Sequence, residues 1–173
     1  MGPVATLVLL LAQAAPTAPA APAAAPTSVF VREALRICVD TAAQPAKLRE
    51  LAAREKWTAA TPASVPTHAG VATGSGKVSP AALWKGEIDG LAFTITLYDT
   101  PGGLLFSSRC EIGAWGLDLD AAHAAFTAQE GFEDKSQAGW PIKQYAVKKP
   151  PLSVVYAAGE RDGGVLHTFT AER

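Results

Sequence analysis

Two cysteines, Cys38 and Cys110, are the residues whose type and position point most directly to covalent chemistry. Cys38 continues an apolar stripe with helical spacing, and Cys110 takes an inward position in a segment that alternates like a strand. In an oxidising compartment we expect a disulfide between them, which would close a loop of about 73 residues and stabilise the fold by roughly 4 kcal/mol. The alternative is two separate buried thiols, because free cysteine packs well in protein cores. Redox catalysis is not expected, since the chain has no Cys-x-x-Cys motif.

Acid–base catalysis would depend on Glu111, Asp118, Asp120 and His123, which are close together in the sequence. His123 follows Asp120 by three residues on an expected helix, so the two side chains would share one face. The alternative is a surface histidine beside a carboxylate that caps the helix, and the sequence favours this alternative. We therefore assign no catalytic residue. A secreted hydrolase-like enzyme that uses the region from Glu111 to His123 is the second hypothesis.

Metal and cofactor sites have no support in the sequence. The three histidines are far apart, and the HExxH, GxSxG and DxDxDG motifs are absent. Residues 70–79 superficially resemble a phosphate-binding loop, but five residues separate Gly70 from Gly76, and Val78 follows Lys77. The nucleotide motif has four residues at that place and a hydroxyl residue after the lysine. We therefore predict neither a metal nor a cofactor.

Charged residues divide the chain into two parts. The 173 residues include 15 Lys and Arg and 16 Asp and Glu, and the formal net charge of −1 argues against binding to nucleic acid. Residues 1–28 contain none of these charges and begin with an apolar run that is too short to span a membrane. Ala12-Gln13-Ala14 suits signal peptidase, so residues 1–14 are predicted to be a signal peptide that is cleaved between Ala14 and Ala15. The alternative is a disordered apolar tail on a cytosolic protein.

If residues 1–14 are removed, the mature protein begins with a linker and lies outside the cytoplasm. Residues 15–28 are rich in alanine and contain four prolines, so they are expected to form an extended linker, either a spacer or an inert N-terminus. No cysteine precedes Cys38 that could carry a lipid, so no stable membrane anchor would remain after cleavage. The protein would be periplasmic or extracellular in a bacterium. As partners we expect another envelope protein or a small ligand.

Two helices are expected at the start of the folded part. An apolar stripe with i, i+3, i+4, i+7 spacing from Val31 to Cys38 predicts an amphipathic helix over about 28–42, with Ser28 as its N-cap. A second amphipathic helix is expected to begin at Pro45, because proline suits the first turn of a helix.

Alternation with a period of two predicts strands in the remainder of the chain. Residues 58–81 are poor in large apolar side chains and are predicted to be a long flexible loop. Asp89-Gly90 between apolar runs predicts a hairpin, and Arg109 and Glu111 are expected to face outward from the strand that follows. A helix is expected from Asp118 or Asp120 to about residue 129, and further strands near 142–148, 152–158 and 164–171. These elements make residues 29–173 a single α+β domain, with two N-terminal helices and an antiparallel β-β-β-α-β-β-β sheet packed on helices.

Four expected elements follow one another along the chain in a definite order. A helix with a Cys-Val element precedes a second helix that ends with Trp, and a strand with the second Cys and a further helix come after them. This pattern is carried by Phe30-Val31, Cys38-Val39-Asp40, Ala52-Ala53, Trp57, Arg109-Cys110-Glu111-Ile112 and the expected helix 118–129. In this pattern the chain resembles a set of uncharacterised secreted proteins of alphaproteobacteria over about residues 30–135. The resemblance implies a secreted α+β domain and brings no known activity. We therefore expect a small exported binding or interaction protein without catalysis.

Overall fold

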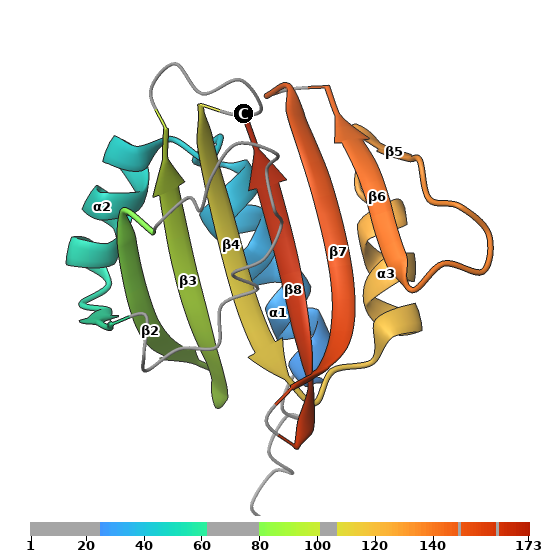
Figure 1. The fold of residues 1–173 in the computed structure, drawn as a ribbon, viewed down its shortest axis with the longest axis horizontal. Coiled ribbons are helices and arrows are strands. Elements are labelled where there is room, and N and C mark those ends of the chain that lie inside the picture. The colour runs from blue at the N-terminus through green and yellow to red at the C-terminus, as the bar shows by residue number, and fades with distance from the viewer. Residues whose placement is uncertain (1–24, 62–79, 101–106, 149, 162) are drawn as a thin grey trace, which may run out of the picture.

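The structure is a computed structural model that describes residues 25–61, 80–100, 107–148, 150–161 and 163–173. In these parts of the chain the strands form one antiparallel sheet of eight strands. The helices all lie against one face of this sheet, behind it in the view of Figure 1. The predicted α+β fold is therefore confirmed.

The order of the elements agrees roughly with the prediction. The helical segments are α1 (Pro26–Ala34), the π-helical turn η1 (Leu35–Val39), α2 (Pro45–Arg54) and α3 (Leu119–Thr127). The strands are β1 (Thr58–Ala59), β2 (Ala82–Ile88), β3 (Leu91–Asp99), β4 (Ser108–Trp115), β5 (Phe132–Asp134), β6 (Ile142–Val147), β7 (Leu152–Arg161) and β8 (Gly164–Glu172).

The sheet consists of two halves that meet in its centre. Strands β1 to β4 form one meander and β5 to β8 a second, and each meander follows helical segments in the chain. Across the sheet the order is β1-β2-β3-β4-β8-β7-β6-β5, so the second meander runs in reverse order. The last strands of the two halves, β4 and β8, pair antiparallel at the joint. Side chains of both halves therefore meet on these two strands.

The two outermost strands were not predicted. Strand β1 has two residues and β5 has three, which is too short to show an alternating pattern. Strand β1 lies in the segment 58–81 that was predicted to be a loop, whereas residues 62–79 of that segment lie outside the described residues. The predicted hairpin is confirmed, since β2 and β3 are joined at Asp89 and Gly90, both with positive φ.

The first helix begins earlier than expected. Ser28 does not cap it, because α1 starts at Pro26 and the Ser28 hydroxyl donates a hydrogen bond to the Ala25 carbonyl (2.7 Å). Proline suits this position because it has no backbone N–H to satisfy. The end of the predicted linker 15–28 therefore belongs to the helix. The predicted signal peptide and its cleavage site lie outside the described residues.

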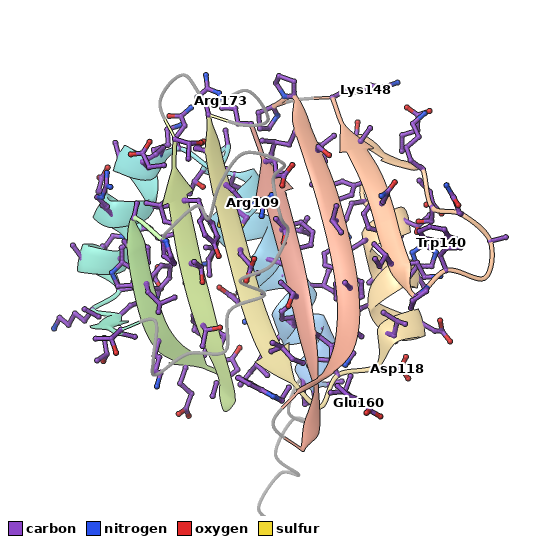
Figure 2. All side chains as sticks on the ribbon, viewed as in Figure 1. Arg109, Asp118, Trp140, Lys148, Glu160 and Arg173 are labelled. Carbon is purple, nitrogen blue, oxygen red and sulfur yellow. A yellow bond between two sulfur atoms is a disulfide. The ribbon has the colours of Figure 1, made fainter. Side chains whose placement is uncertain are left out.

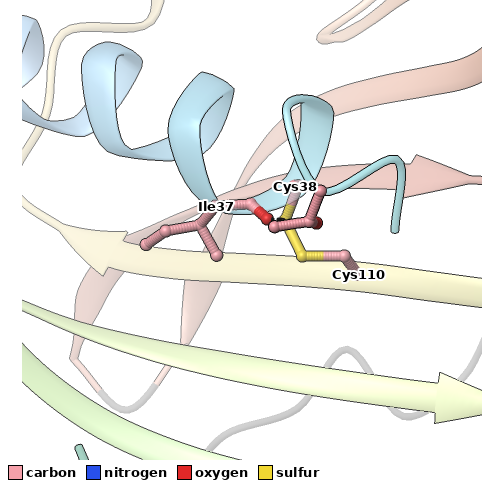
Figure 3. The surroundings of a disulfide bond; sticks show 4 residues. Ile37, Cys38 and Cys110 are labelled. Atoms are coloured by element: carbon pink, nitrogen blue, oxygen red, sulfur yellow. Dashed lines mark hydrogen bonds between the residues drawn. A yellow bond between two sulfur atoms is a disulfide. The ribbon is translucent and has the colours of Figure 1, made fainter. Parts of the chain in front are cut away.

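The predicted disulfide joins the helical layer to the middle of the sheet. After α1 the chain continues as the π turn η1, in which the Asp40 amide donates to the Leu35 carbonyl (2.9 Å). Cys38 of this turn is bonded to Cys110 of β4, with their Cα atoms 5.4 Å apart (Figure 3). Both cysteines are fully buried. The alternative of two separate thiols is therefore wrong.

Phe126 of α3 connects the second half of the sheet to its helix. Its ring contacts those of Phe169 on β8, Tyr156 on β7, Tyr145 on β6 and Phe132 on β5, with centroid distances of 4.8, 5.3, 5.9 and 6.4 Å. Aromatic contacts of this kind bury large areas and stabilise the packing beyond the buried area alone. One side chain of α3 thus reaches four neighbouring strands.

The first half is also joined to its helices by ion pairs. Glu33 of α1 is buried and accepts hydrogen bonds from the Nε atoms of Arg32 (2.8 Å) and Arg36 (2.7 Å). Arg32 also pairs with Asp89 in the β2–β3 turn, and Arg36 pairs with Glu55 after α2. A buried carboxylate needs such partners, so this chain of charges fixes the relative positions of α1, α2 and the hairpin. None of the described helices is long and apolar enough to cross a membrane.

Candidate functional site

The structure does not bring together the four residues that were considered for acid–base catalysis. Asp118 is the N-cap of α3, and its Oδ1 accepts a hydrogen bond from the Ala121 amide (2.8 Å). Asp120 is exposed in the first turn of the same helix. Glu111 lies on the opposite face of the sheet from α3, because it alternates with Cys110, which points to the helices. His123 has other partners.

His123 contacts a tyrosine and an aspartate that the sequence analysis did not single out. Its Nδ1 lies 2.6 Å from the Tyr145 hydroxyl of β6, and its Nε2 lies 3.6 Å from Asp134 Oδ2 of β5. Burial, together with the charge of Asp134, raises the pKa of Tyr145, so the phenol stays neutral at ordinary pH. The group therefore holds α3 against β5 and β6. In the sequence only Tyr145, in a predicted strand, could have indicated this group. Asp134 could not, because its strand β5 was not predicted.

A second tyrosine–histidine pair is buried in the core. The Tyr156 hydroxyl lies 2.7 Å from His167 Nδ1, and both side chains face the helices. Burial lowers the pKa of His167, so the imidazole is neutral at pH 7 and forms a neutral hydrogen bond with the phenol. Neither group is accessible to a substrate, so this pair is structural.

The face of the sheet that points away from the helices is polar in its centre. Its side chains belong to strands β3, β4 and β8, which are neighbours. Three rows of residues stand side by side across these strands in the observed register. They are Tyr98, Arg109 and Glu172; Thr96, Glu111 and Thr170; and Thr94, Gly113 and Thr168. Figure 2 shows Arg109 over the middle of this face.

Arg109 and Glu111 are on the expected face but are not solvated. Only 8% of Arg109 and 6% of Glu111 are exposed. Arg109 forms an ion pair with Glu172 of β8, and its guanidinium lies 5.6 Å from the centre of the Tyr98 ring. Burial raises the pKa of Tyr98 to about 12, the carboxylate of Glu111 adds to this rise, and Arg109 opposes it. Alternation therefore predicted the direction of these side chains correctly, but their expected exposure was wrong.

Thr168 adds an unsatisfied polar group to this face. Its hydroxyl oxygen is buried and has no hydrogen-bond partner among the described residues. A buried hydroxyl without a partner costs about 1–3 kcal/mol of stability. Gly113 and Ala157 flank Thr168 on the neighbouring strands, and neither side chain can supply a hydrogen bond. The Thr168 hydroxyl therefore does not stabilise this face through a hydrogen bond to the described part of the chain.

In the middle of β6 and β7, the described side chains of the same face are accessible and uncharged. Val155, Ala157 and Gly159 of β7 are half-buried, and Gln144 of β6 is exposed. Trp140, just before β6, is 55% exposed and lies at the side of the sheet in Figure 2. The floor of this accessible part thus combines the small residues Ala157 and Gly159 with the larger Val155 and Ile142, and Trp140 lies at its border.

These features make the polar face the candidate functional site. Among the described residues, no three His, Cys, Asp or Glu side chains are arranged to hold a metal ion. Comparison of the chain with protein-family models, curated proteins and solved structures finds no match. The geometry of this face is therefore the basis for assigning a function.

Proposed function

We propose that this chain is a small exported bacterial protein with a non-catalytic binding function, and that its ligand binds the sheet face opposite the helices. The observation that carries the proposal is the burial of Arg109 and Glu111 on a face against which no described helix packs. Charged side chains are costly to bury, so a sheet face that served only stability would carry apolar residues there. The unsatisfied hydroxyl of Thr168 supports the same proposal.

Two features support export to the periplasm or beyond the cell. A disulfide is compatible with an oxidising compartment, and the sequence of residues 1–14 has the features of a signal peptide. The intact mass of the protein recovered from the periplasm or medium should correspond to a chain that begins at or near Ala15. A full-length mass would contradict the proposal of a cleaved signal.

The alternative, a hydrolase-like enzyme, has less support. It requires Glu111, Asp118, Asp120 and His123 to converge, but Asp118 caps a helix and Glu111 lies on the other face of the sheet. A small ligand or another envelope protein is therefore the partner that we propose, and a substrate is not.

A thermal-shift experiment tests the binding proposal. The mature protein is mixed with a panel of sugars, amino acids, carboxylates and short peptides, and with an extract of the bacterial envelope. A ligand should raise Tm, because it binds only the folded state. Ala157→Arg, which places a long side chain on the floor of the face, should abolish the rise in Tm. Ala124→Arg, on the exposed side of α3, is the matched control and should preserve it.

Two results would contradict the proposal. In the first, neither the panel nor the extract changes Tm. In the second, a ligand stabilises the unchanged protein and the Ala157→Arg variant equally, which would place its site elsewhere on the molecule.

A further inference from the structure

The π turn η1 interrupts a segment for which the sequence predicts one amphipathic helix. No glycine or proline occurs in residues 27–43, and these are the residue types that usually break or kink a helix. In η1 the Asp40 amide nevertheless donates to the Leu35 carbonyl, where an α-helix would use the carbonyl of Arg36. Turns of this kind are rare, so its presence points to a contact outside the segment.

The wider turn rotates Cys38 and Val39 toward the sheet. In a regular helix each residue advances by about 100°, so Val39, nine positions after the buried Phe30, would lie about 180° from it, on the side away from the core. Residues of a π turn advance by less, because the turn contains more of them. In the structure Val39 is only 7% exposed, and Cys38 is fully buried over Cys110 of β4 (Figure 3). The π turn and the disulfide therefore depend on the same rotation.

The connection from η1 to α2 depends on this turn as well. Ala42 and Ala43 lie between the two elements and have positive φ angles of 55° and 51°, which are uncommon for residues other than glycine. Their amides donate to the carbonyls of Val39 and Cys38 (2.8 and 2.9 Å). These hydrogen bonds tie the start of α2 to the residues of η1, so a change in the turn would displace α2.

We infer that η1 is a redox-dependent conformational switch: the Cys38–Cys110 bond holds the turn in its π form, and without the bond the segment continues α1 as a regular α-helix. Bond formation removes two electrons and two protons from the two thiols, and an external disulfide takes them up and is reduced to two thiols. On oxidation the Asp40 amide exchanges the carbonyl of Arg36 for that of Leu35, and Val39 turns into the core. The helical layer therefore has its final form only in the oxidised protein. This inference does not depend on the binding function proposed above.

NMR identifies the acceptor of the Asp40 amide through scalar couplings across hydrogen bonds. The experiment compares the oxidised protein with the Cys38→Ala/Cys110→Ala variant. The oxidised protein should show a coupling to the Leu35 carbonyl, and the variant should show a coupling to the Arg36 carbonyl. A coupling to Leu35 in both proteins would overturn the inference, because the burial of Val39 would then be sufficient to hold the π turn.

Substitution of Val39 tests the same inference through stability. Val39→Ala should lower the Tm of the oxidised protein by several degrees, because it removes buried methyl groups. It should have little effect in the variant without the bond, where Val39 would be exposed. Val31→Ala is the matched control, because Val31 is buried in α1 ahead of the turn and should lower the Tm of both forms equally. An equal loss from Val39→Ala in the two forms would contradict the switch.

These comparisons require that the variant without the bond folds. If it is unfolded in buffer, both measurements are made in trimethylamine N-oxide, which favours the compact state. A variant that stays unfolded there would show that the bond is needed for the whole fold and not for the turn alone, so the inference would be wrong. A rise in Tm of the oxidised protein with a ligand is independent of all these results, so the binding function stands or fails separately.

Discussion

Replacing both cysteines by alanine should destabilise the folded domain by several kilocalories per mole. Cys38 and Cys110 are 72 residues apart in the sequence. In the chain-entropy model the bond lowers the entropy of the unfolded chain by about 15 cal/mol/K, which corresponds to roughly 4 kcal/mol at room temperature. Domains of this size have a free energy of unfolding of about 5–15 kcal/mol, so the loss would be a large fraction of the total.

Equilibrium unfolding in urea measures this effect. The Cys38→Ala/Cys110→Ala variant should unfold at a lower urea concentration, and its m-value should rise because its unfolded chain can expand further. In a thermal scan the midpoint should fall by roughly 12 °C. Because both cysteines are fully buried, we also expect the folded protein to resist reduction by dithiothreitol until it is partly unfolded.

The result that would refute this reasoning is a loss of less than about 1 kcal/mol with an unchanged m-value. Such a result would mean that the unfolded chain is already constrained without the bond, or that the bond contributes little to the fold. A matched comparison is the unchanged protein after reduction in denaturant, which should behave like the double variant. If the two differ, the effect would come from the alanine side chains and not from the loss of the cross-link.

Three further predictions concern polar groups. Asp118→Ala should lower the free energy of unfolding by about 1 kcal/mol because it removes the N-cap of α3, whereas exposed Asp120→Ala should have a much smaller effect; urea unfolding measures both. Thr168→Val should leave stability unchanged or raise it by about 1 kcal/mol, because it removes a buried hydroxyl that has no partner in the described part of the chain; a clear loss in the same assay would show that the hydroxyl is satisfied. The pKa of His167 is lower in the folded state than in the unfolded chain, so folding favours the neutral imidazole. The contribution of His167 to stability is therefore fully present above about pH 6.5 and is lost as the pH falls through the folded-state pKa. Urea midpoints between pH 7.5 and pH 4.5 should show this loss, and His167→Phe should reduce it; an equal slope in the variant would contradict it.

Residue spacing was sufficient to predict most of the elements that build the fold. The stripe from Val31 to Cys38 indicated a helix, and Asp89-Gly90 indicated the first hairpin. The pairing of Cys38 with Cys110 could be predicted because the chain has two cysteines, both at inward positions, and export to an oxidising compartment was expected. The signals for the helix and the hairpin are local, so they do not depend on which elements come to lie next to each other.

The features that could not be predicted depend on contacts between distant segments. Strand β5 has no pattern of its own and exists because it pairs with β6. Its absence from the prediction also concealed Asp134 as a partner of His123. Similarly, alternation shows that Arg109 and Glu111 point away from the helices, but it does not show how deeply they are buried.

The two sides of β4 link the stability of the fold to the proposed site. Cys110 points to the helices and is bonded to η1, while its neighbours Arg109 and Glu111 point to the opposite face. The disulfide therefore fixes the position of β4 at Cys110, directly between Arg109 and Glu111. Strands β4 and β8 also join the two halves of the sheet, and Arg109 of β4 forms an ion pair with Glu172 of β8. A shift of β4 would therefore move Arg109 away from Glu172. A disulfide at this point positions the polar centre as well as closing a long loop, which explains its location on the central strand and not at an edge.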